Sequence, residues 1–143
     1  ATAESCTGGG VGARLTDVPG SSDVFLGGVI AYDNTVKEAL LDVPHDLLTQ
    51  HGAVSEPVAA AMVRGVTRRL GAQAGIAVTG VAGPGGGTAE KPVGLVYIAV
   101  AAGDSVSVFR SVFAGDRGEI RTRAAQGALN RLRLEMLKAD RVI

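Results

Sequence analysis

The sequence contains few of the residues that mark disulfide-bonded, nucleic-acid-binding or membrane proteins. It has a single cysteine, Cys6, which excludes an internal disulfide framework and is typical of a reducing cytoplasm. Tryptophan is absent, and two tyrosines and three phenylalanines are the only aromatic residues, so base stacking is disfavoured. No apolar run reaches the ~18 residues that a membrane-spanning helix needs. We therefore expect a cytoplasmic protein with neither a nucleic-acid nor a membrane partner.

Charge is balanced overall but unevenly distributed. Fourteen basic residues match fourteen acidic ones, yet residues 1–60 hold two basic and eight acidic side chains. The arginines of the second half are spread along helix-like stretches with acidic neighbours, so they form no stripe for nucleic acid. With 143 residues, 46% hydrophobic and 20% charged, the chain is predicted to form one globular domain over residues 1–143.

Glycine is the residue in excess. The chain has 21 glycines, about twice the ordinary ~7%. Many of them cluster in the segments 8–12 and 83–87, without the period of a fibrous protein. Such clusters indicate backbone that turns sharply or lies close to a ligand.

Hydrophobic periodicity predicts alternating strands and helices. Apolar runs predict the end of a strand at 1–4 and strands at 24–32, 75–79, 95–101 and 106–113, the last two joined as a hairpin. Helical spacing predicts helices over 7–18, from 34, from 44, over 55–70 and over 116–138, the last opened by a capping box between Asp116 and Glu119. The predicted fold class is α/β, a three-layer α/β/α sandwich around a mixed, mostly parallel sheet.

The segment 4–9, Glu-Ser-Cys-Thr-Gly-Gly, is the first candidate for chemistry because it falls where a strand gives way to a helix. Free N–H groups at a helix start can hold a phosphate or a developing oxyanion, and Ser5 would face the same point. Ser5 or Thr7 could instead merely cap the helix. Cys6 is a rival nucleophile, but adjacent side chains point in different directions, so only one of the pair can face the site.

Lys37 is the second candidate. It is one of three lysines and the only one among residues 1–60. If Asn34 caps the following helix, Lys37 falls in the first turn, where the helix dipole disfavours its charge. A partly desolvated lysine can lose its proton near neutral pH and act as the base for a serine nucleophile. An ordinary surface lysine is the alternative interpretation.

Two further segments could hold an anion. The glycines of 83–87 could form a nest of N–H groups, although the segment matches neither the P-loop nor the dinucleotide fingerprint. Arg117 and Arg121 lie one helical turn apart and could clamp a phosphate, while a flexible loop and solvated arginines are the plainer alternatives. His45 and His51 lack the spacing of a zinc site, so no metal is expected.

Six ordered segments together resemble the C-terminal domain of the CinA family. They are 2–9, 32–34 with Lys37, 51–57, 80–86, 91–94 and 115–117. The resemblance implies a bacterial nicotinamide mononucleotide amidohydrolase (NMN deamidase) of pyridine nucleotide salvage, without cofactor or metal and commonly oligomeric. It also implies that a helix and the start of a strand precede Thr2, and that many relatives carry a molybdopterin-binding-like domain ahead of this one.

The residue analysis and the resemblance together assign roles. Ser5 is predicted to attack the carboxamide carbon, Lys37 to accept the hydroxyl proton and later protonate ammonia, and Tyr32 to orient or relay. N–H groups of 7–9 would hold the oxyanion, and the 83–87 nest with Arg117 or Arg121 would hold the phosphate. The full set of expected substrate contacts is Thr7, Gly8, Gly9, Ser22, Asn34, Thr79, Gly83, Gly85, Gly86, Arg117 and Arg121. The competing hypothesis is a non-catalytic nucleotide-binding or interaction module of a larger protein.

Overall fold

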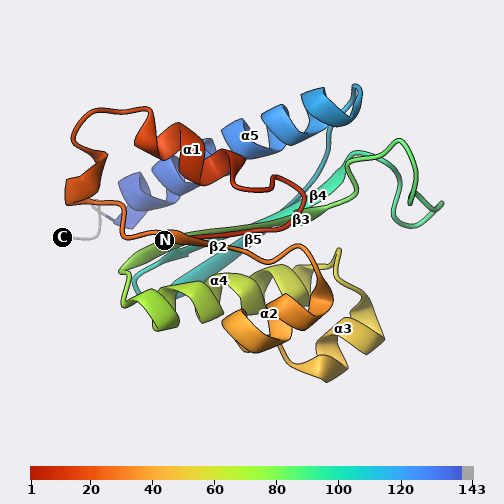
Figure 1. Ribbon diagram of the computed structural model, residues 1–143, viewed down its shortest axis with the longest axis horizontal. Helices are drawn as coiled ribbons and strands as arrows, with labels where there is room; N and C mark the ends of the chain where they lie inside the picture. The colour runs from red at the N-terminus through yellow and green to blue at the C-terminus, as the bar shows by residue number, and fades with distance from the viewer. Residues whose placement is uncertain (140–143) are drawn as a thin grey trace.

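The structure is a computed structural model that describes residues 1–139, and it forms a sheet between two layers of helices (Figure 1). Its elements in chain order are β1 (Thr2–Glu4), α1 (Gly10–Thr16), the 3-10 helix η1 (Ser21–Asp23), β2 (Gly28–Ile30), α2 (Asn34–Leu41), α3 (His45–His51), α4 (Glu56–Leu70), β3 (Ala74–Gly80), β4 (Leu95–Ala102), β5 (Ser105–Val112) and α5 (Arg117–Ala139).

The five strands form one mixed sheet in the order β2-β1-β3-β4-β5. β1 pairs in parallel with both β2 and β3, whereas β4 is antiparallel to β3 and to β5. Four strands therefore run in the same direction and β4 opposes them. The predicted hairpin is confirmed, with Gly103 at φ 57° in its turn. The predicted α/β/α class with a mixed, mostly parallel sheet is likewise confirmed.

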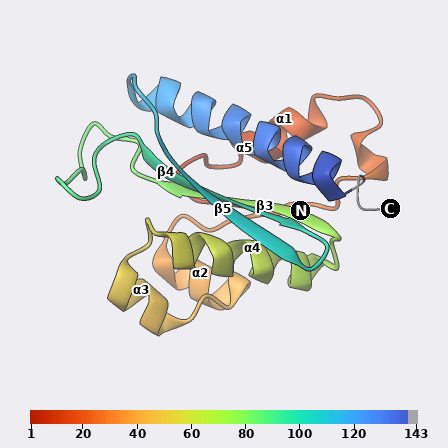
Figure 2. The ribbon, with the colours of Figure 1, turned by 180° about the vertical axis from the view of Figure 1, so that it is seen from behind.

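Each face of the sheet buries its own apolar cluster. α1 and α5 cover one face, and α4 with α2 and α3 covers the other (Figures 1 and 2). Val11, Ile98 and Ile120 belong to the cluster under α1 and α5, whereas Leu41 and Met62 belong to the cluster under α4. The capping box of α5 is confirmed: Asp116 N–H donates to Glu119, and Glu119 N–H donates back to Asp116, at 2.8 and 2.9 Å.

Two predicted elements are shorter than expected. The prediction of a nine-residue buried strand at 24–32 is wrong. Only Gly28–Ile30 forms a strand, β2, and it lies at the edge of the sheet. The residues before β2 form a turn, in which Phe25 N–H donates to the Ser21 carbonyl at 2.8 Å. The predicted helix 7–18 is reduced to α1, because Gly9 at φ 100° keeps the preceding residues out of the helix.

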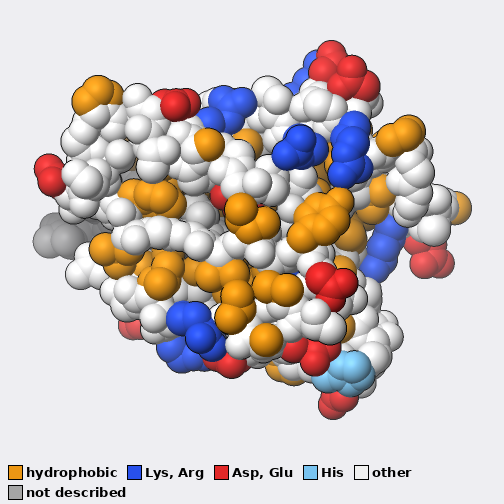
Figure 3. All heavy atoms as spheres, in the orientation of Figure 1, with side chains coloured by type: hydrophobic (Ala, Val, Ile, Leu, Met, Phe, Trp, Pro, Cys, Tyr) orange, Lys and Arg blue, Asp and Glu red, His pale blue; other side chains and the backbone are white. Residues whose placement is uncertain are grey.

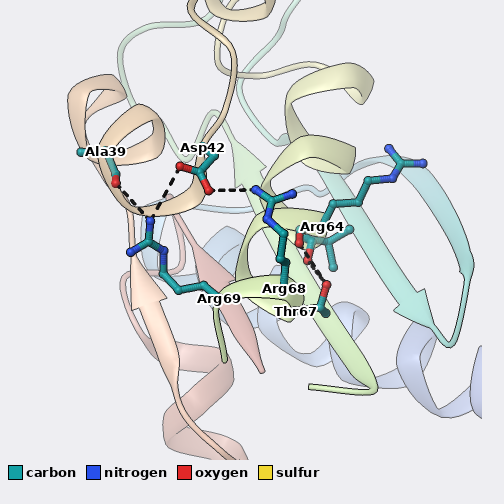
Figure 4. Close-up of polar contacts among 7 residues, drawn as sticks. Ala39, Asp42, Arg64, Thr67, Arg68 and Arg69 are labelled. Carbon is teal, nitrogen blue, oxygen red and sulfur yellow. Dashed lines mark hydrogen bonds and ion pairs between the residues drawn. The ribbon is translucent and has the colours of Figure 1, made fainter. Parts of the chain in front are cut away.

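The position of α2 is set by close backbone contact with α4. A Cβ atom at Gly65 would overlap the Leu41 carbonyl group, so only glycine lets the two helices approach this closely. At the same end of α2, the carboxylate of Asp42 lies between Arg68 at 2.8 Å and Arg69 at 3.7 Å (Figure 4). Because these charged groups are exposed, they contribute little, and the Gly65 contact is the tighter constraint on α2.

We expect Gly65→Ala to lower the free energy of unfolding in urea. Overpacking of this kind costs about 1–3 kcal/mol, more than the roughly 0.5–1 kcal/mol that alanine returns within a helix. Gly10→Ala is the matched control, because the nearest atom to its added Cβ, on Ala125, is 3.9 Å away. Equal stability of the two variants would show that the Leu41 contact does not constrain α2.

Candidate active site

The structure brings Ser5 and Lys37 together at the carboxyl end of β1. Ser5 directly follows β1, and Lys37 projects from α2. The Nζ atom of Lys37 donates a hydrogen bond to Ser5 Oγ at 3.2 Å. Ser5 is 8% exposed and Lys37 is 1% exposed. The surface-lysine alternative is therefore wrong, and the two residues predicted as nucleophile and base are in direct contact.

The other partners of Lys37 are neutral. Its Nζ atom donates to the carbonyl oxygens of Ala31 at 2.9 Å and Tyr32 at 3.0 Å. Burial lowers the pKa of Lys37, while the negative charge of Asp33 acts in the opposite direction. An uncharged lysine has a lone pair that can accept the Ser5 hydroxyl proton, so this geometry suits general-base catalysis.

The helix cap beside Lys37 differs from the prediction. The N-cap of α2 is Asp33, not Asn34, and its side chain accepts from Thr35 N–H at 2.8 Å. Lys37 is consequently the fourth residue of the helix. Burial rather than the helix start is thus the main cause of its lowered pKa.

Cys6 is adjacent to Ser5 in sequence, but its thiol has a raised pKa. Burial raises the pKa of the Cys6 thiol to about 11, so it is protonated at neutral pH. The Nζ atom of Lys37 contacts Ser5 Oγ instead. Of the two rival nucleophiles, Ser5 is therefore the one with a base at hydrogen-bond distance.

A pocket of about 220 Å³ opens onto this pair. It is lined by Ser5, Cys6, Tyr32, Asn34, Lys37, Ala53, Val54, Thr79, Gly80, Ala82 and Arg117. Asn34 and Thr79 are thus brought to the site as predicted, and Thr79 Oγ1 donates to the Ala53 carbonyl at 2.9 Å. Ala53 and Val54 were missed as site residues, although the motif at 51–57 was the signal that could have found them.

Arg117 and Tyr32 join three segments at the pocket rim. Arg117, the first residue of α5, donates to the Gly83 carbonyl at 2.7 Å and to the Tyr32 hydroxyl at 3.1 Å. Tyr32 is 62% exposed, and it contacts Lys37 through its backbone carbonyl. The hydrogen bonds therefore place the Tyr32 hydroxyl with Arg117, and its backbone orients the lysine.

Backbone groups of the predicted oxyanion-binding turn already form hydrogen bonds within the protein. Gly8 N–H already donates to the Ser5 carbonyl at 3.0 Å, so the role predicted for it is wrong. Neither Thr7, 1% exposed, nor Gly9 lines the pocket. Arg121 donates to the Cys6 carbonyl at 3.0 Å and the Thr7 carbonyl at 3.3 Å. Arg121 therefore stabilises the turn after Ser5 and is not placed in the pocket as predicted.

Glu4 is a site-supporting residue that the sequence analysis missed. It is 2% exposed, and its carboxylate accepts from the N–H groups of Val11 at 2.8 Å and Gly12 at 3.0 Å. Glu4 thus caps α1, so the alternative that Ser5 or Thr7 provides this cap is wrong. The signal was an acidic residue at a strand end before a helix that begins with glycine.

Several other predicted contacts lie away from the pocket. Ser22 is exposed in η1, before the amino end of β2 and at the opposite end of the sheet from Ser5 (Figure 1). Gly85 and Gly86 are exposed in the long loop 81–94, which extends from the body of the domain, and neither lines the pocket. Gly83 is buried beside the rim, where its carbonyl, rather than an N–H nest, makes the observed contact with Arg117.

Two further features bear on cofactors and membranes. Within residues 1–139, no group of three or more His, Cys, Asp or Glu side chains is placed to hold a metal ion. In the same part of the chain, no helix combines the length and the apolar character needed to cross a bilayer.

The fold and site define a three-layer α/β/α domain with a buried serine–lysine pair at a strand end. The family model of the CinA C-terminal domain matches residues 1–136, and the chain belongs to this family. It is 59% identical over 138 residues to a CinA-like protein of Parasynechococcus marenigrum, covering 94% of this chain and 33% of that protein. A CinA-like protein of Gemmatimonas aurantiaca is 58% identical, covering 93% and 31% of the two chains.

Solved structures agree with this assignment. The competence damage-inducible protein A of Klebsiella pneumoniae superimposes with a TM-score of 0.92 at 34% identity, covering 95% of this chain and 84% of that one. The competence/damage inducible protein CihA of Agrobacterium tumefaciens gives 0.88 at 44% identity, covering 96% and 82%. This chain spans about a third of the length of the curated relatives it matches.

The buried lysine makes a prediction about stability and pH. Because the pKa of Lys37 is lowered on folding, the unfolded chain binds more protons between the folded pKa and the ordinary ~10.4, so the free energy of unfolding rises with pH in that window. We expect Lys37→Met to flatten this rise, measured by urea denaturation at several pH values. Lys138→Met, which removes an exposed lysine, is the control variant. Parallel curves for the parent and Lys37→Met would contradict the lowered pKa.

Proposed function

We propose that this domain is a serine–lysine amidohydrolase that converts nicotinamide mononucleotide and water into nicotinic acid mononucleotide and ammonia. The observation that carries the proposal is the buried hydrogen bond between Lys37 Nζ and Ser5 Oγ at the base of a pocket. The resemblance to the CinA family suggests the substrate, and the site suggests the chemistry.

In the first half-reaction, neutral Lys37 accepts the Ser5 hydroxyl proton as Oγ bonds to the carboxamide carbon. The carbon–nitrogen bond then breaks, and Lys37 returns the proton to the leaving nitrogen, releasing ammonia and leaving an ester on Ser5. In the second half, water attacks the ester while Lys37 takes its proton. The ester bond breaks, Ser5 recovers the proton from Lys37, and the carboxylic acid product leaves.

The pocket size fits the reacting end of such a substrate. Its volume of about 220 Å³ is below the roughly 300–1,000 Å³ of pockets that enclose whole ligands. We infer that the nicotinamide ring enters the pocket while the ribose phosphate stays at the rim. Arg117 is the cation at that rim, and it would exchange its contact with the Tyr32 hydroxyl for the phosphate.

Substitution of the two rival nucleophiles tests the reaction. Ser5→Ala should abolish ammonia release from nicotinamide mononucleotide without unfolding the domain, whereas Cys6→Ala should keep most of the activity because Lys37 forms its hydrogen bond with Ser5 Oγ. Ammonia release and circular dichroism are the measurements. The reverse pattern would move the nucleophile to Cys6. Binding of the nucleotide by the parent without any ammonia release would favour the non-catalytic module.

A comparison of two arginines tests the phosphate contact. Because a charge-assisted hydrogen bond contributes about 1.5–3 kcal/mol, Arg117→Ala should lower kcat/KM for the mononucleotide about ten- to a hundred-fold, with little effect on the weak turnover of the riboside. Arg121→Ala, which loosens the turn after Ser5, should lower both rates by similar factors. Equal losses on both substrates in Arg117→Ala would place the phosphate elsewhere.

A further inference from the structure

One wall of the pocket is formed by the connection between α3 and α4. Ala53 and Val54 of this connection line the pocket, and both lie outside any helix or strand. Backbone of this kind gains no hydrogen bonds from a helix or a sheet, so its carbonyl groups need other donors. The position of the wall therefore depends on the donors that those carbonyl groups contact.

The three consecutive carbonyl groups of residues 51–53 each accept a side-chain hydrogen bond. Lys91 Nζ donates to the first of them, Ser55 Oγ to the second at 2.8 Å and Thr79 Oγ1 to the third at 2.9 Å. Ser55 directly precedes α4 and Thr79 belongs to β3, so these two donors come from the packed body of the domain. Lys91 comes instead from the long loop 81–94.

The loop 81–94 contacts the pocket wall through Lys91. The two ends of the loop are joined, because Gly94 N–H donates to the Val81 carbonyl at 2.8 Å. In Figure 3, basic and acidic side chains lie where the loop extends beside the body of the domain, on the side toward α3. Lys91 is the only basic residue of the loop. Within residues 1–139, it provides the only hydrogen bond between this loop and the segment 51–55.

The local structure on both sides suits the Lys91 contact. Lys91 N–H donates to Thr88 Oγ1, and Thr88 N–H donates back to the Lys91 carbonyl, both at 2.9 Å, so the backbone of Lys91 is held in a turn. The accepting carbonyl belongs to His51, the last residue of α3, and a helix end of this kind favours a cation. Gly52, at φ 74°, leaves space for the amine, because a Cβ atom there would lie 2.9 Å from Lys91 Nζ.

We propose that Lys91 is a positioning residue, which holds the wall of Ala53 and Val54 in the place where it receives the nicotinamide ring. The inference rests on the proposed function and adds a residue to it. Lys91 is not among the residues that line the pocket, and its amine binds the His51 carbonyl, so it acts on the substrate through the wall. A wall that is already in place costs less free energy to order when the ring binds.

Steady-state kinetics with nicotinamide mononucleotide and its riboside test this role. Lys91→Met should raise KM about three- to tenfold, by similar factors for both substrates because both carry the ring, with a smaller change in kcat. Lys91→Arg should keep KM close to that of the parent, since a guanidinium can also donate to the His51 carbonyl. Lys138→Met, which removes an exposed lysine of α5, is the matched control and should leave KM unchanged.

Two kinetic results would overturn the proposal. A loss confined to the mononucleotide would make Lys91 a phosphate contact rather than a positioning residue. An unchanged KM in Lys91→Met would show that the wall keeps its place without the lysine.

Hydrogen exchange on the free protein separates this inference from the proposed function, because it requires no turnover. Gly52 N–H donates to the Leu48 carbonyl at 2.9 Å, so its exchange rate reports on the end of α3 beside the wall. Exchange at Gly52 should be faster in Lys91→Met than in the parent or in Lys138→Met, whereas the amides of the β4–β5 hairpin should not change.

The exchange and the ammonia assay give distinguishable outcomes. Unchanged exchange at Gly52 would overturn the role of Lys91 even if the parent releases ammonia. Faster exchange in Lys91→Met, combined with no ammonia release by the parent, would support Lys91 as the residue that holds the wall and would contradict only the proposed reaction.

Discussion

Burying an amine whose hydrogen-bond partners are all neutral oxygen atoms costs free energy, and Lys37 is such an amine. Two backbone carbonyls and the Ser5 hydroxyl accept its hydrogen bonds, and no carboxylate within residues 1–139 does so. A carboxylate at hydrogen-bond distance would hold the lysine in its charged form. Without such a carboxylate, burial lowers the pKa of Lys37 and favours the uncharged form, in which a lysine can accept a proton from serine.

This contact requires two elements to be placed independently. The close contact between Gly65 and Leu41 sets the position of α2 against α4, and therefore the position of the Lys37 backbone. The turn after β1 is held from both sides, since Glu4 binds N–H groups of α1 and Arg121 binds the carbonyls that follow Ser5. Charged side chains thus brace the turn without entering the hydrogen bonds of the Ser5–Lys37 pair.

The pocket is lined by residues from several elements of the domain. All its lining residues fall between Ser5 and Arg117, and they come from both halves of the domain. Arg117 connects these halves, because it spans from the start of α5 to the β2–α2 connection and to the loop after β3. The rim is therefore formed by segments more than eighty residues apart in sequence, held together by one side chain.

Local patterns in the sequence were enough to predict the elements with strong local signals. Periodicity found α4, α5 and the β4–β5 hairpin nearly to the residue, and the capping box marked the start of α5, because these features depend on neighbours within a few positions. It also singled out Ser5 and Lys37 through an unusual setting for each residue type. Four features became visible only in the folded chain: Glu4 caps α1, Arg121 stabilises a turn, Ser22 lies far from the site, and β2 is a short exposed edge strand. Each of these depends on a partner distant in sequence, and hydrophobic pattern carries no information about which strand has a neighbour on only one side.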